Sequence, residues 1–188
     1  MRIVGGSSRG LKLAEVDAPG IRPTTDRIRE ALFNILAHDP ARRLEDGPFP
    51  AGASVLDVFA GTGALGLEAP SRGAAQASFI ENDPAALRLL KANAARLKAG
   101  ERATVLQGDA LKPRAAREPV DLVLMDPPYG EDLAGRALSA LRGKGWIGPE
   151  TLVVVETDRK DGFQLPDGFT QEREKDYGRT RLRFLRLL

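Results

Sequence analysis

The alternation of apolar and polar positions predicts an ordered series of strands and helices from residue 53 onward. Short apolar runs predict buried strands, and the Ala- and Leu-rich stretches between them predict helices. The expected strands cover residues 53–59, 77–81, 103–107, 120–125 and 152–156, and two of the expected helices cover 84–99 and 133–141. This order is typical of an α/β fold with a mostly parallel, doubly wound sheet, which binds ligands at the carboxyl ends of its strands.

The last part of the chain has a different pattern. Residues 169–177 and 180–187 are two strand-like runs joined through Gly178. This arrangement predicts an antiparallel hairpin. We therefore expect the parallel sheet to have an antiparallel C-terminal edge.

The N-terminal part predicts a small appendage. Residues 2–5 and 11–16 are short apolar runs around a Gly- and Ser-rich segment, which predicts a β-hairpin with a flexible, basic tip. Ile28, Leu32 and Leu36 then recur at helical spacing. Thr24 or Thr25 is suited to cap that helix.

A segment rich in Pro, Gly and charge follows this helix, as is typical of a linker. We expect an N-terminal hairpin-and-helix appendage at residues 1–37, a linker at 38–52 and the main domain at 53–188.

Composition narrows the possible chemistry. The chain has 188 residues and no cysteine, which excludes disulfides, Cys-ligated zinc and thiol nucleophiles. The one histidine, His38, argues against a His-based metal site or a Ser-His-Asp triad. No apolar run approaches the roughly 20 residues of a membrane span, and the N-terminus lacks the apolar region of a signal peptide. We expect a cytoplasmic protein without a metal.

Positive charge is concentrated along the chain although the net charge is only +2. Residues 88–117 carry eight basic side chains, opposed by Glu101 and Asp109, and the tail adds Arg179, Arg181, Arg183 and Arg186. This distribution is compatible with a polyanionic partner. Solvated helix faces and strand edges are the other interpretation.

A glycine-rich loop follows the first expected strand of the main domain. Gly61-Thr62-Gly63-Ala64-Leu65-Gly66 matches the G-x-G-x-x-G pattern, which permits a tight strand-to-helix turn and a close ligand approach. Such a loop also suits a dinucleotide, with its pyrophosphate at the helix N-terminus. Asp57, four residues before Gly61, favours a cationic ligand instead, such as the α-ammonium of S-adenosylmethionine (AdoMet).

Two more acids stand at the ends of expected strands. Glu81 ends the second strand, and an ionised carboxylate there can accept both hydroxyls of a ribose. A dehydrogenase would use an acid in a similar place. Asp109 follows the third strand and could accept from an adenine amino group. A helix cap or a surface acid is the alternative role for each.

The most informative motif is Asp126-Pro127-Pro128-Tyr129, at the end of the fourth strand. The two prolines fix φ and remove two N–H donors, so that the remaining groups are acceptors beside an aromatic ring. This site suits a planar group that bears an amine. The motif resembles the (Asp/Asn/Ser)-Pro-Pro-aromatic motif of methyltransferases that act on exocyclic or amide nitrogens.

These acceptors have a direct chemical use. Hydrogen bonds from an exocyclic amine to Asp126 and the Pro127 carbonyl would favour a pyramidal nitrogen and aim its lone pair at a methyl donor. Fixed acceptors would also stabilise the positive charge that develops on nitrogen. Tyr129 would stack on a flipped base. The Asp126 carboxylate leans toward guanine, whose N1–H and N2–H are adjacent donors.

The chain as a whole resembles one family, the RsmD-type methyltransferases, which make N2-methylguanine in bacterial 16S ribosomal RNA. The resemblance covers nearly the whole chain and is carried by residues 2–6, 9–13, 22–36, 56–74 and 126–129.

The resemblance implies AdoMet as cofactor and the small ribosomal subunit or its assembly intermediate as partner. No residue pattern indicates the oligomeric state, and a monomer is the default expectation. The resemblance also implies a cofactor site formed by Asp57, Phe59, Ala60, Gly61, Thr62, Gly63, Glu81, Asn82, Asp109 and Ala110. It implies catalytic roles for Asp126, Pro127, Pro128 and Tyr129. It implies that Arg9, Lys12, Arg22 and Arg27 contact RNA or lie in segments that close over the cofactor. For Arg22 and Arg27, a structural pairing with Asp26 or Glu30 is the other interpretation.

Other functions remain open at this point. An N6-adenine methyltransferase on DNA or RNA would share the site, and a glutamine-N5 protein methyltransferase usually has Asn in place of Asp126. A nicotinamide dehydrogenase would leave Asp57 and residues 126–129 unexplained. A non-catalytic RNA-binding assembly factor would need neither an intact glycine loop nor an intact Asp-Pro-Pro-Tyr motif.

Overall fold

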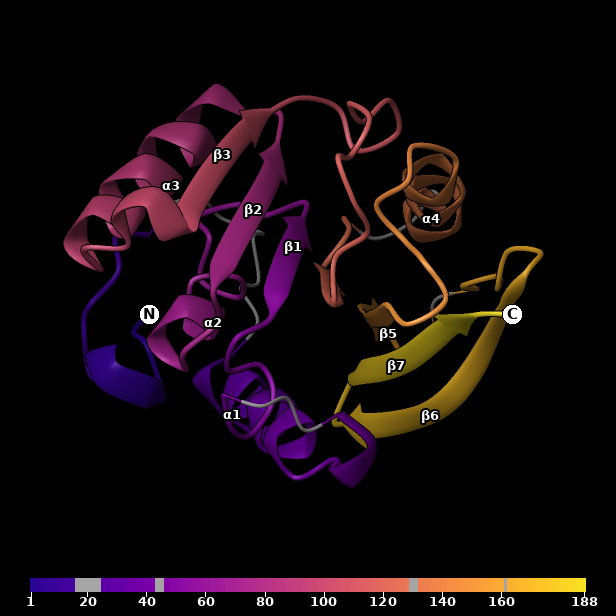
Figure 1. Ribbon diagram of the computed structural model, residues 1–188, viewed down its shortest axis with the longest axis horizontal. Coiled ribbons are helices and arrows are strands. Elements are labelled where there is room, and N and C mark those ends of the chain that lie inside the picture. Colours follow the sequence, from indigo (N-terminus) through magenta and orange to yellow (C-terminus); the bar gives the residue numbers. More distant parts are fainter. Residues whose placement is uncertain (16–24, 43–45, 129–131, 161) are drawn as a thin grey trace.

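The computed structural model describes residues 1–15, 25–42, 46–128, 132–160 and 162–188, and in this part of the chain seven strands form a single sheet in the order β3-β2-β1-β4-β5-β7-β6 (Figure 1). The strands are β1 Ser54–Val58, β2 Gln76–Glu81, β3 Ala103–Gln107, β4 Leu122–Met125, β5 Leu152–Asp158, β6 Phe169–Tyr177 and β7 Thr180–Leu187. Strands β1 to β5 are mutually parallel, and β7 runs antiparallel to both β5 and β6. The predicted fold class is confirmed.

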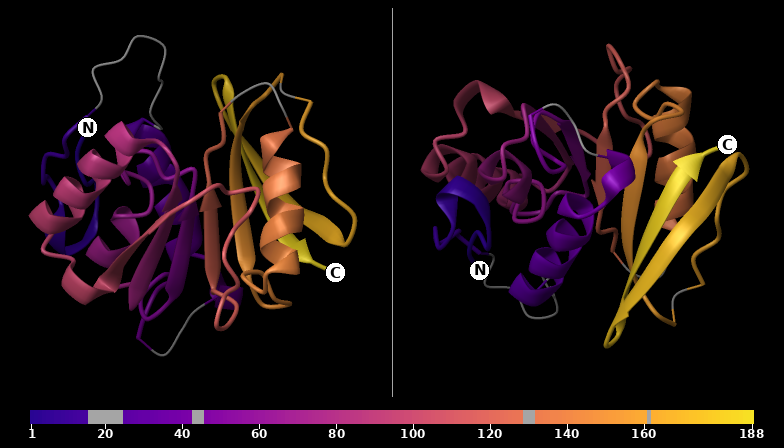
Figure 2. Two further views of the ribbon diagram at one scale, coloured as in Figure 1. Left: turned by 90° about the horizontal axis from the view of Figure 1, so that it is seen from above. Right: turned by 60° about the horizontal axis from the view of Figure 1, so that its bottom comes forward.

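Helices cover both faces of this sheet. They are α1 Asp26–Ala37, α2 Glu68–Ser71, α3 Pro84–Arg96 and α4 Leu133–Gly143, with short 3-10 turns at Gly6–Ser8, Pro40–Arg42 and Gly100–Arg102. One apolar cluster joins α1 and α3 to one face, and a second cluster joins α4 to the other face (Figure 2). Among the described residues, no helix is long and apolar enough to cross a membrane.

Local sequence signals explain where the two longest helices begin. The Thr25 hydroxyl accepts from the Ile28 N–H at the start of α1, which decides between the two threonines that the sequence offered. Asp83 caps α3 by accepting from the Ala86 N–H at 2.7 Å, and Pro84 occupies the first helical position. The α2 helix is short because Pro70, which has no N–H, lies within it.

The N-terminal segment differs from the regular hairpin that its apolar runs predict. Its two arms share one isolated antiparallel bridge, between Arg2 and Lys12, within the described residues. The expectation of a flexible tip is wrong for residues 6–8. The hydroxyl of Ser71 in α2 accepts from the Ser8 N–H at 3.0 Å and donates to the Gly5 carbonyl at 2.6 Å, which holds this turn against the main domain.

The predicted appendage also shares its core with the main domain. Ile3 and Leu13 from the N-terminal arms, together with Phe33 from α1, are buried in the same cluster as Val55 of β1 and Phe79 of β2. Residues 1–37 and residues 53–188 therefore pack into one apolar core. The predicted division into appendage, linker and main domain describes the sequence pattern and not separately packed units.

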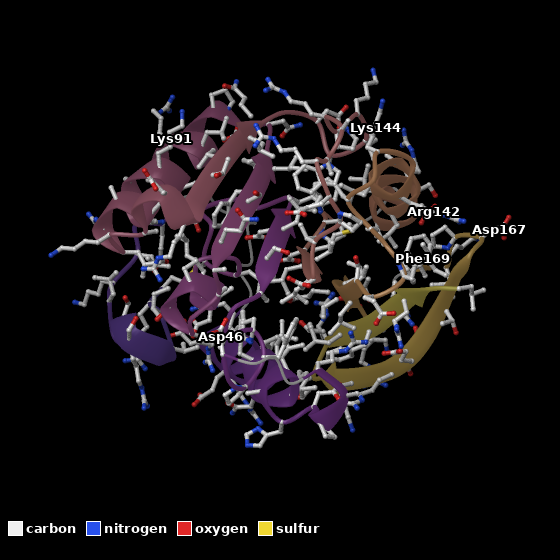
Figure 3. All side chains as sticks on the ribbon, viewed as in Figure 1. Asp46, Lys91, Arg142, Lys144, Asp167 and Phe169 are labelled. Carbon is white, nitrogen blue, oxygen red and sulfur yellow. The ribbon has the colours of Figure 1, made fainter. Side chains whose placement is uncertain are left out.

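The C-terminal hairpin has the bounds that its pattern predicts. β6 and β7 pair from Phe169↔Leu187 to Tyr177↔Thr180, with one irregularity near Gln171. The loop before β6 is tied to α4, since Arg142 donates to the Asp167 carbonyl at 3.1 Å, and Figure 3 labels both residues at that end of the hairpin.

Candidate active site

The order of the strands changes direction between β1 and β4, because β2 and β3 lie on one side of this pair and β5 lies on the other. These neighbouring parallel strands end in register, with Val58 opposite Met125. The connections that follow β1 lead to helices on one face, whereas β4 leads to α4 on the other face. A crevice forms where such connections diverge, and open α/β sheets bind their ligands there. The glycine loop after β1 and the Asp-Pro-Pro segment after β4 therefore leave adjacent strands at the same edge of the sheet.

The glycine loop turns sharply directly after β1. Phe59 has a φ of +60°, an uncommon value for a bulky residue, and Gly61 and Gly63 have φ values of +55° and +79°. Backbone strain of this kind is concentrated at functional sites. A Cβ added to Gly61 would meet no atom within 4 Å, so this side of the loop is open to a ligand.

Asp57 fixes the far end of the same loop. Its side chain is 1% exposed, and its Oδ2 accepts from the Gly66 N–H at 2.8 Å. A Cβ on Gly66 would lie 2.6 Å from the Asp57 carboxylate and 2.6 Å from the ring of Phe79. The third glycine of the motif is therefore required for packing, whereas Gly61 leaves open space.

Glu81 organises three backbone segments at the end of β2. Its Oε2 accepts from the Gly61 N–H at 2.7 Å, and its Oε1 accepts from the N–H groups of Asn82 and Asp83, both at 2.8 Å. Its own carbonyl accepts from the Gly108 N–H. Each carboxylate oxygen has two lone pairs, so these three contacts leave one acceptor position, on Oε2, for a single ribose hydroxyl rather than for both.

Asp109 and Ala110 lie directly after β3, beside Glu81. The Asp109 carboxylate is exposed and accepts from the Leu111 N–H at 2.8 Å through one oxygen, Oδ1. Ala110 is buried in the apolar cluster of the α4 face. The loop that follows β3 thus carries an exposed carboxylate next to a buried alanine.

The Asp-Pro-Pro segment leaves the neighbouring strand β4. Asp126 is half-buried, Pro127 is buried and Pro128 is exposed, whereas Tyr129 lies outside the described residues. Because neither proline has an N–H, residues 127 and 128 offer acceptors alone along the backbone.

Three carboxyl groups meet in this crevice. Burial raises the pKa of Asp57 to about 8, and although the Gly66 N–H lowers it, the negative charges of Asp126 and Glu81 raise it further. A buried carboxyl beside two others favours either a proton or a cationic ligand. The structure therefore brings together Asp57, Glu81 and Asp126 from three different strands, as their positions at strand ends predict.

The predicted RNA-binding residues lie elsewhere. Arg9, Lys12 and Arg27 are exposed, and within the described residues their side chains form no hydrogen bond or ion pair. Arg9 and Lys12 belong to the N-terminal arms, and Arg27 lies in the first turn of α1. Arg22 lies outside the described residues.

Asn93 is a site residue that sequence patterns do not reveal. This fully buried side chain of α3 accepts from the Ala14 N–H at 2.7 Å and donates to the Ala14 carbonyl at 3.1 Å. It also donates to the Thr62 carbonyl at 2.9 Å. One side chain thus ties the N-terminal arm to the glycine loop. An Asn among Ala and Leu residues of a helix carries no local signal for this role.

Comparison with known proteins decides the family. A family model described as "Conserved hypothetical protein 95" matches residues 1–186. The chain belongs to this family. The resemblance to the RsmD-type methyltransferases is thereby confirmed, and the family's residues extend over both the N-terminal arms and the sheet.

Two similar proteins match nearly the whole of this chain. "Ribosomal RNA small subunit methyltransferase D" of Escherichia coli is 42% identical over 185 residues, which are 97% of this chain and 88% of that protein. The solved structure of the Escherichia coli protein yhhF is 38% identical, with a TM-score of 0.82, and the match covers 100% of this chain and 98% of that one.

A more distant structure shows the same fold. An RNA methyltransferase from Salinibacter ruber, solved in complex with S-adenosyl-L-homocysteine, has a TM-score of 0.65 at 16% identity. The match covers 88% of this chain and 93% of that chain. The family fold is therefore one that methyltransferases use.

Proposed function

We propose that this protein transfers a methyl group from AdoMet to the exocyclic N2 of a guanine in bacterial 16S ribosomal RNA. It would act in the cytoplasm, as a monomer, on the small ribosomal subunit or an assembly intermediate. The observation that carries the proposal is the register of β1 and β4, which sets the Asp126 acceptor group beside the Asp57 and glycine-loop crevice. The 42% identity to a small-subunit rRNA methyltransferase supports the class of substrate.

The residues of the crevice fit AdoMet. The buried Asp57 carboxyl, raised in pKa among like charges, favours the ligand's ammonium group. Glu81 would accept from one ribose hydroxyl, Asp109 would accept from the adenine amino group, and the open side of Gly61 leaves room for close approach. Bound there, AdoMet supplies an electrophilic methyl group on a sulfonium.

Asp126 would orient the amine that receives the methyl group. Guanine presents N1–H and N2–H side by side, and a carboxylate can accept from both donors. The Pro127 carbonyl would accept from the other N2–H. These contacts hold the nitrogen lone pair toward the methyl donor and stabilise the charge that develops on nitrogen. Asp126 or water would then take the released proton.

The two prolines keep these acceptors in place. Pro127 is buried, and neither ring offers a donor that would compete with the amine for the acceptors. Fixed φ angles also reduce the freedom that substrate binding would otherwise have to remove. Tyr129 would stack on the guanine after the base leaves its helix.

Methyl transfer from labelled AdoMet tests the proposal. The substrates are unmodified small-subunit particles, naked 16S RNA and duplex DNA, followed by nucleoside analysis of the product. We expect N2-methylguanosine at one site, with particles preferred over naked RNA.

The other products separate the alternatives. N6-methyladenine would keep the cofactor site and the mechanism but replace the substrate. Binding of AdoMet without transfer to any nucleic acid would contradict the proposal and point to a protein substrate or to a non-catalytic role in assembly.

A further inference from the structure

Strand β5 extends beyond the end of β4. The last pair between them is Met125↔Val155, and β5 continues to Asp158, which pairs with Thr180 at the start of β7. Three more residues at roughly 3.3 Å each carry β5 about 10 Å past that pair. We call residues 156–160 and 178–181 the projecting wall. Figure 2 shows the β6–β7 turn at the end of the sheet to which the β4 and β5 arrows point.

The wall rises next to the candidate active site. Neighbouring strands lie about 4.8 Å apart, so the wall begins one strand away from Asp126.

Cations surround an open pocket at the top of the wall. This pocket has a volume of about 570 Å³ and is lined by Asp158, Arg159, Lys160, Gly178 and Arg179. The side chains of Arg179 and Arg159 are 75% and 52% exposed.

Ion pairs hold both guanidinium groups in position. Arg179 Nη2 lies 3.0 Å from Asp158 Oδ2, and Arg159 Nε lies 3.1 Å from Asp176 Oδ2. A guanidinium has five N–H donors in a planar fork, and each of these contacts uses one nitrogen. The remaining donors belong to exposed side chains that line the pocket, so an anion that reaches the pocket can contact them.

The other tail arginines have a different setting. Arg181, Arg183 and Arg186 lie along β7 and contact carboxylates of β6, among them Glu172 and Glu174. Their side chains are 12% to 34% exposed. Of the four arginines at positions 179, 181, 183 and 186, Arg179 at the turn is therefore the most exposed, and it lines the pocket.

We propose that this pocket binds a backbone phosphate of the RNA strand that flanks the target guanine. The inference rests on the proposed function and adds a docking point for its substrate. A base must leave its stack to reach Asp126, and the strand on either side must then be held. Phosphate contacts set the position and register of a nucleic acid, and the arginine fork matches phosphate oxygens.

Charge-removing variants test the pocket. Lys160→Ala and Arg179→Ala are made singly and together, and Lys144→Ala is the control with the same loss of charge as either single variant. Lys144 lies directly after α4, is exposed and lies outside both the pocket and the basic stretch 88–117 (Figure 3). Binding of small-subunit particles and of a naked 16S RNA fragment is measured across a salt series.

We expect each pocket substitution to weaken RNA binding about tenfold, as the removal of a charge-assisted hydrogen bond would. The plot of log affinity against log salt should become shallower by about 0.7 to 0.9 for each phosphate that the variant no longer neutralises. The control should change affinity less than threefold. Arg179→Lys should restore the salt slope, since it keeps the charge, but not the full affinity, since it lacks the fork.

Affinity for AdoMet and the melting temperature should be unchanged in every variant, because these side chains are exposed. Wild-type binding and slope in the double pocket variant, or an equal loss in the control, would overturn the inference. A loss with particles but not with naked RNA would assign the pocket to a ribosomal protein. If the wild-type protein makes no N2-methylguanosine, the proposed function fails, while the RNA-binding comparison still decides on the pocket.

Discussion

Asp57 and Asp176 are the same residue type in the same sheet, and the fold displaces their pKa values in opposite directions. Asp57 lies at the end of β1, where burial raises its pKa to about 8. Asp176 lies on β6, where the hydrogen bond from Arg181 lowers its pKa. The parallel half of the sheet thus buries carboxyl groups together, whereas the antiparallel edge exposes them beside arginines.

The β6–β7 edge and the crevice at the ends of β1, β2 and β4 differ in the same way in their other residues. Edge strands expose charge, which discourages pairing with other chains, and the cross-strand ion pairs of β6 and β7 provide such a surface. The crevice instead contains a strained Phe59, close-packed glycines and like charges at short range. The crevice departs from ordinary backbone, packing and charge preferences, whereas the β6–β7 edge follows them. Such departures are expected at functional sites.

The largest expected effect comes from Asp126→Ala. Removing the acceptor that orients the amine should lower the rate of methyl transfer by about 10²- to 10³-fold, the typical cost of one preorganised polar contact in a transition state. AdoMet affinity and melting temperature should change little, because Asp126 is half-buried and outside the glycine loop. Glu174→Ala is the control from the antiparallel edge, since Glu174 pairs with Arg181 and Arg183 and not with a pocket residue, and full activity is expected there. Equal losses in both variants would remove the distinction between the regions.

A pair of glycine substitutions gives the next effect. In Gly66→Ala the new Cβ would lie 2.6 Å from Asp57 and from Phe79, so we expect a loss of about 1 to 3 kcal/mol in unfolding free energy and weaker AdoMet binding. In Gly178→Ala the new Cβ meets nothing within 4 Å, and the φ of +63° costs about 1 kcal/mol without an effect on AdoMet. Denaturant unfolding and calorimetry measure both. Equal AdoMet affinities would show that Gly66 does not position the loop.

The pH dependence of stability sharpens the contrast between the carboxyl groups. The folded state raises the pKa of Asp57 from 3.8 to about 8, so this group favours folding most below pH 3.8 and loses that contribution as pH rises to about 8. Asp57→Asn should therefore flatten the decline in stability across this range. Denaturant unfolding of both proteins from about pH 5 to 8 measures it.

The raised pKa of Asp57 also predicts that AdoMet binding releases a proton. A bound ammonium group favours ionised Asp57, so AdoMet binding near pH 7 should release a proton from the wild-type protein and not from Asp57→Asn. Calorimetry in buffers of different ionisation enthalpy detects this release. Identical buffer dependence in the two proteins would contradict the pKa assignment.

The smallest effect is expected for Arg181→Ala on β7. Its guanidinium contacts Asp176 and Glu174 at the exposed edge, where solvent and salt screen the attraction. We expect a slight decrease in melting temperature at low salt that disappears at high salt, with methyl transfer unchanged. A large decrease in melting temperature that persists at high salt would mean that the Arg181 side chain stabilises the fold by packing rather than by its ion pairs.

The elements that the sequence predicted most accurately are those set by local pattern. The bounds of β6 and β7 agree because alternation and the turn at Gly178 are local signals. The helix expected at 84–99 ends at Arg96, since Lys98 and Gly100 have positive φ. β4 begins at Leu122 rather than at residue 120 because the Val120 N–H bonds to the Trp146 carbonyl, a tertiary partner that no local pattern indicates.

The site shows the same division. Asp57, Glu81 and Asp126 were recognisable because each lies at or within one residue of the end of a strand, and parallel strands bring their carboxyl ends to one edge. Asn93 was not, since its partners Ala14 and Thr62 lie 79 and 31 residues away along the chain. Long-range hydrogen bonds of this kind depend on packing that no local pattern records.

By itself, the sequence determined the order of the elements, the family and the motifs at the strand ends, because propensity, periodicity and glycine or proline positions act over a few residues. Only the tertiary structure decided which charges remain exposed for a partner. Register pairs Arg181, Arg183 and Arg186 with the acids of β6, and it leaves Arg179 at a turn beside the crevice. Cross-strand ion pairs depend on which side chains lie close together in space, and the folded chain alone sets those distances.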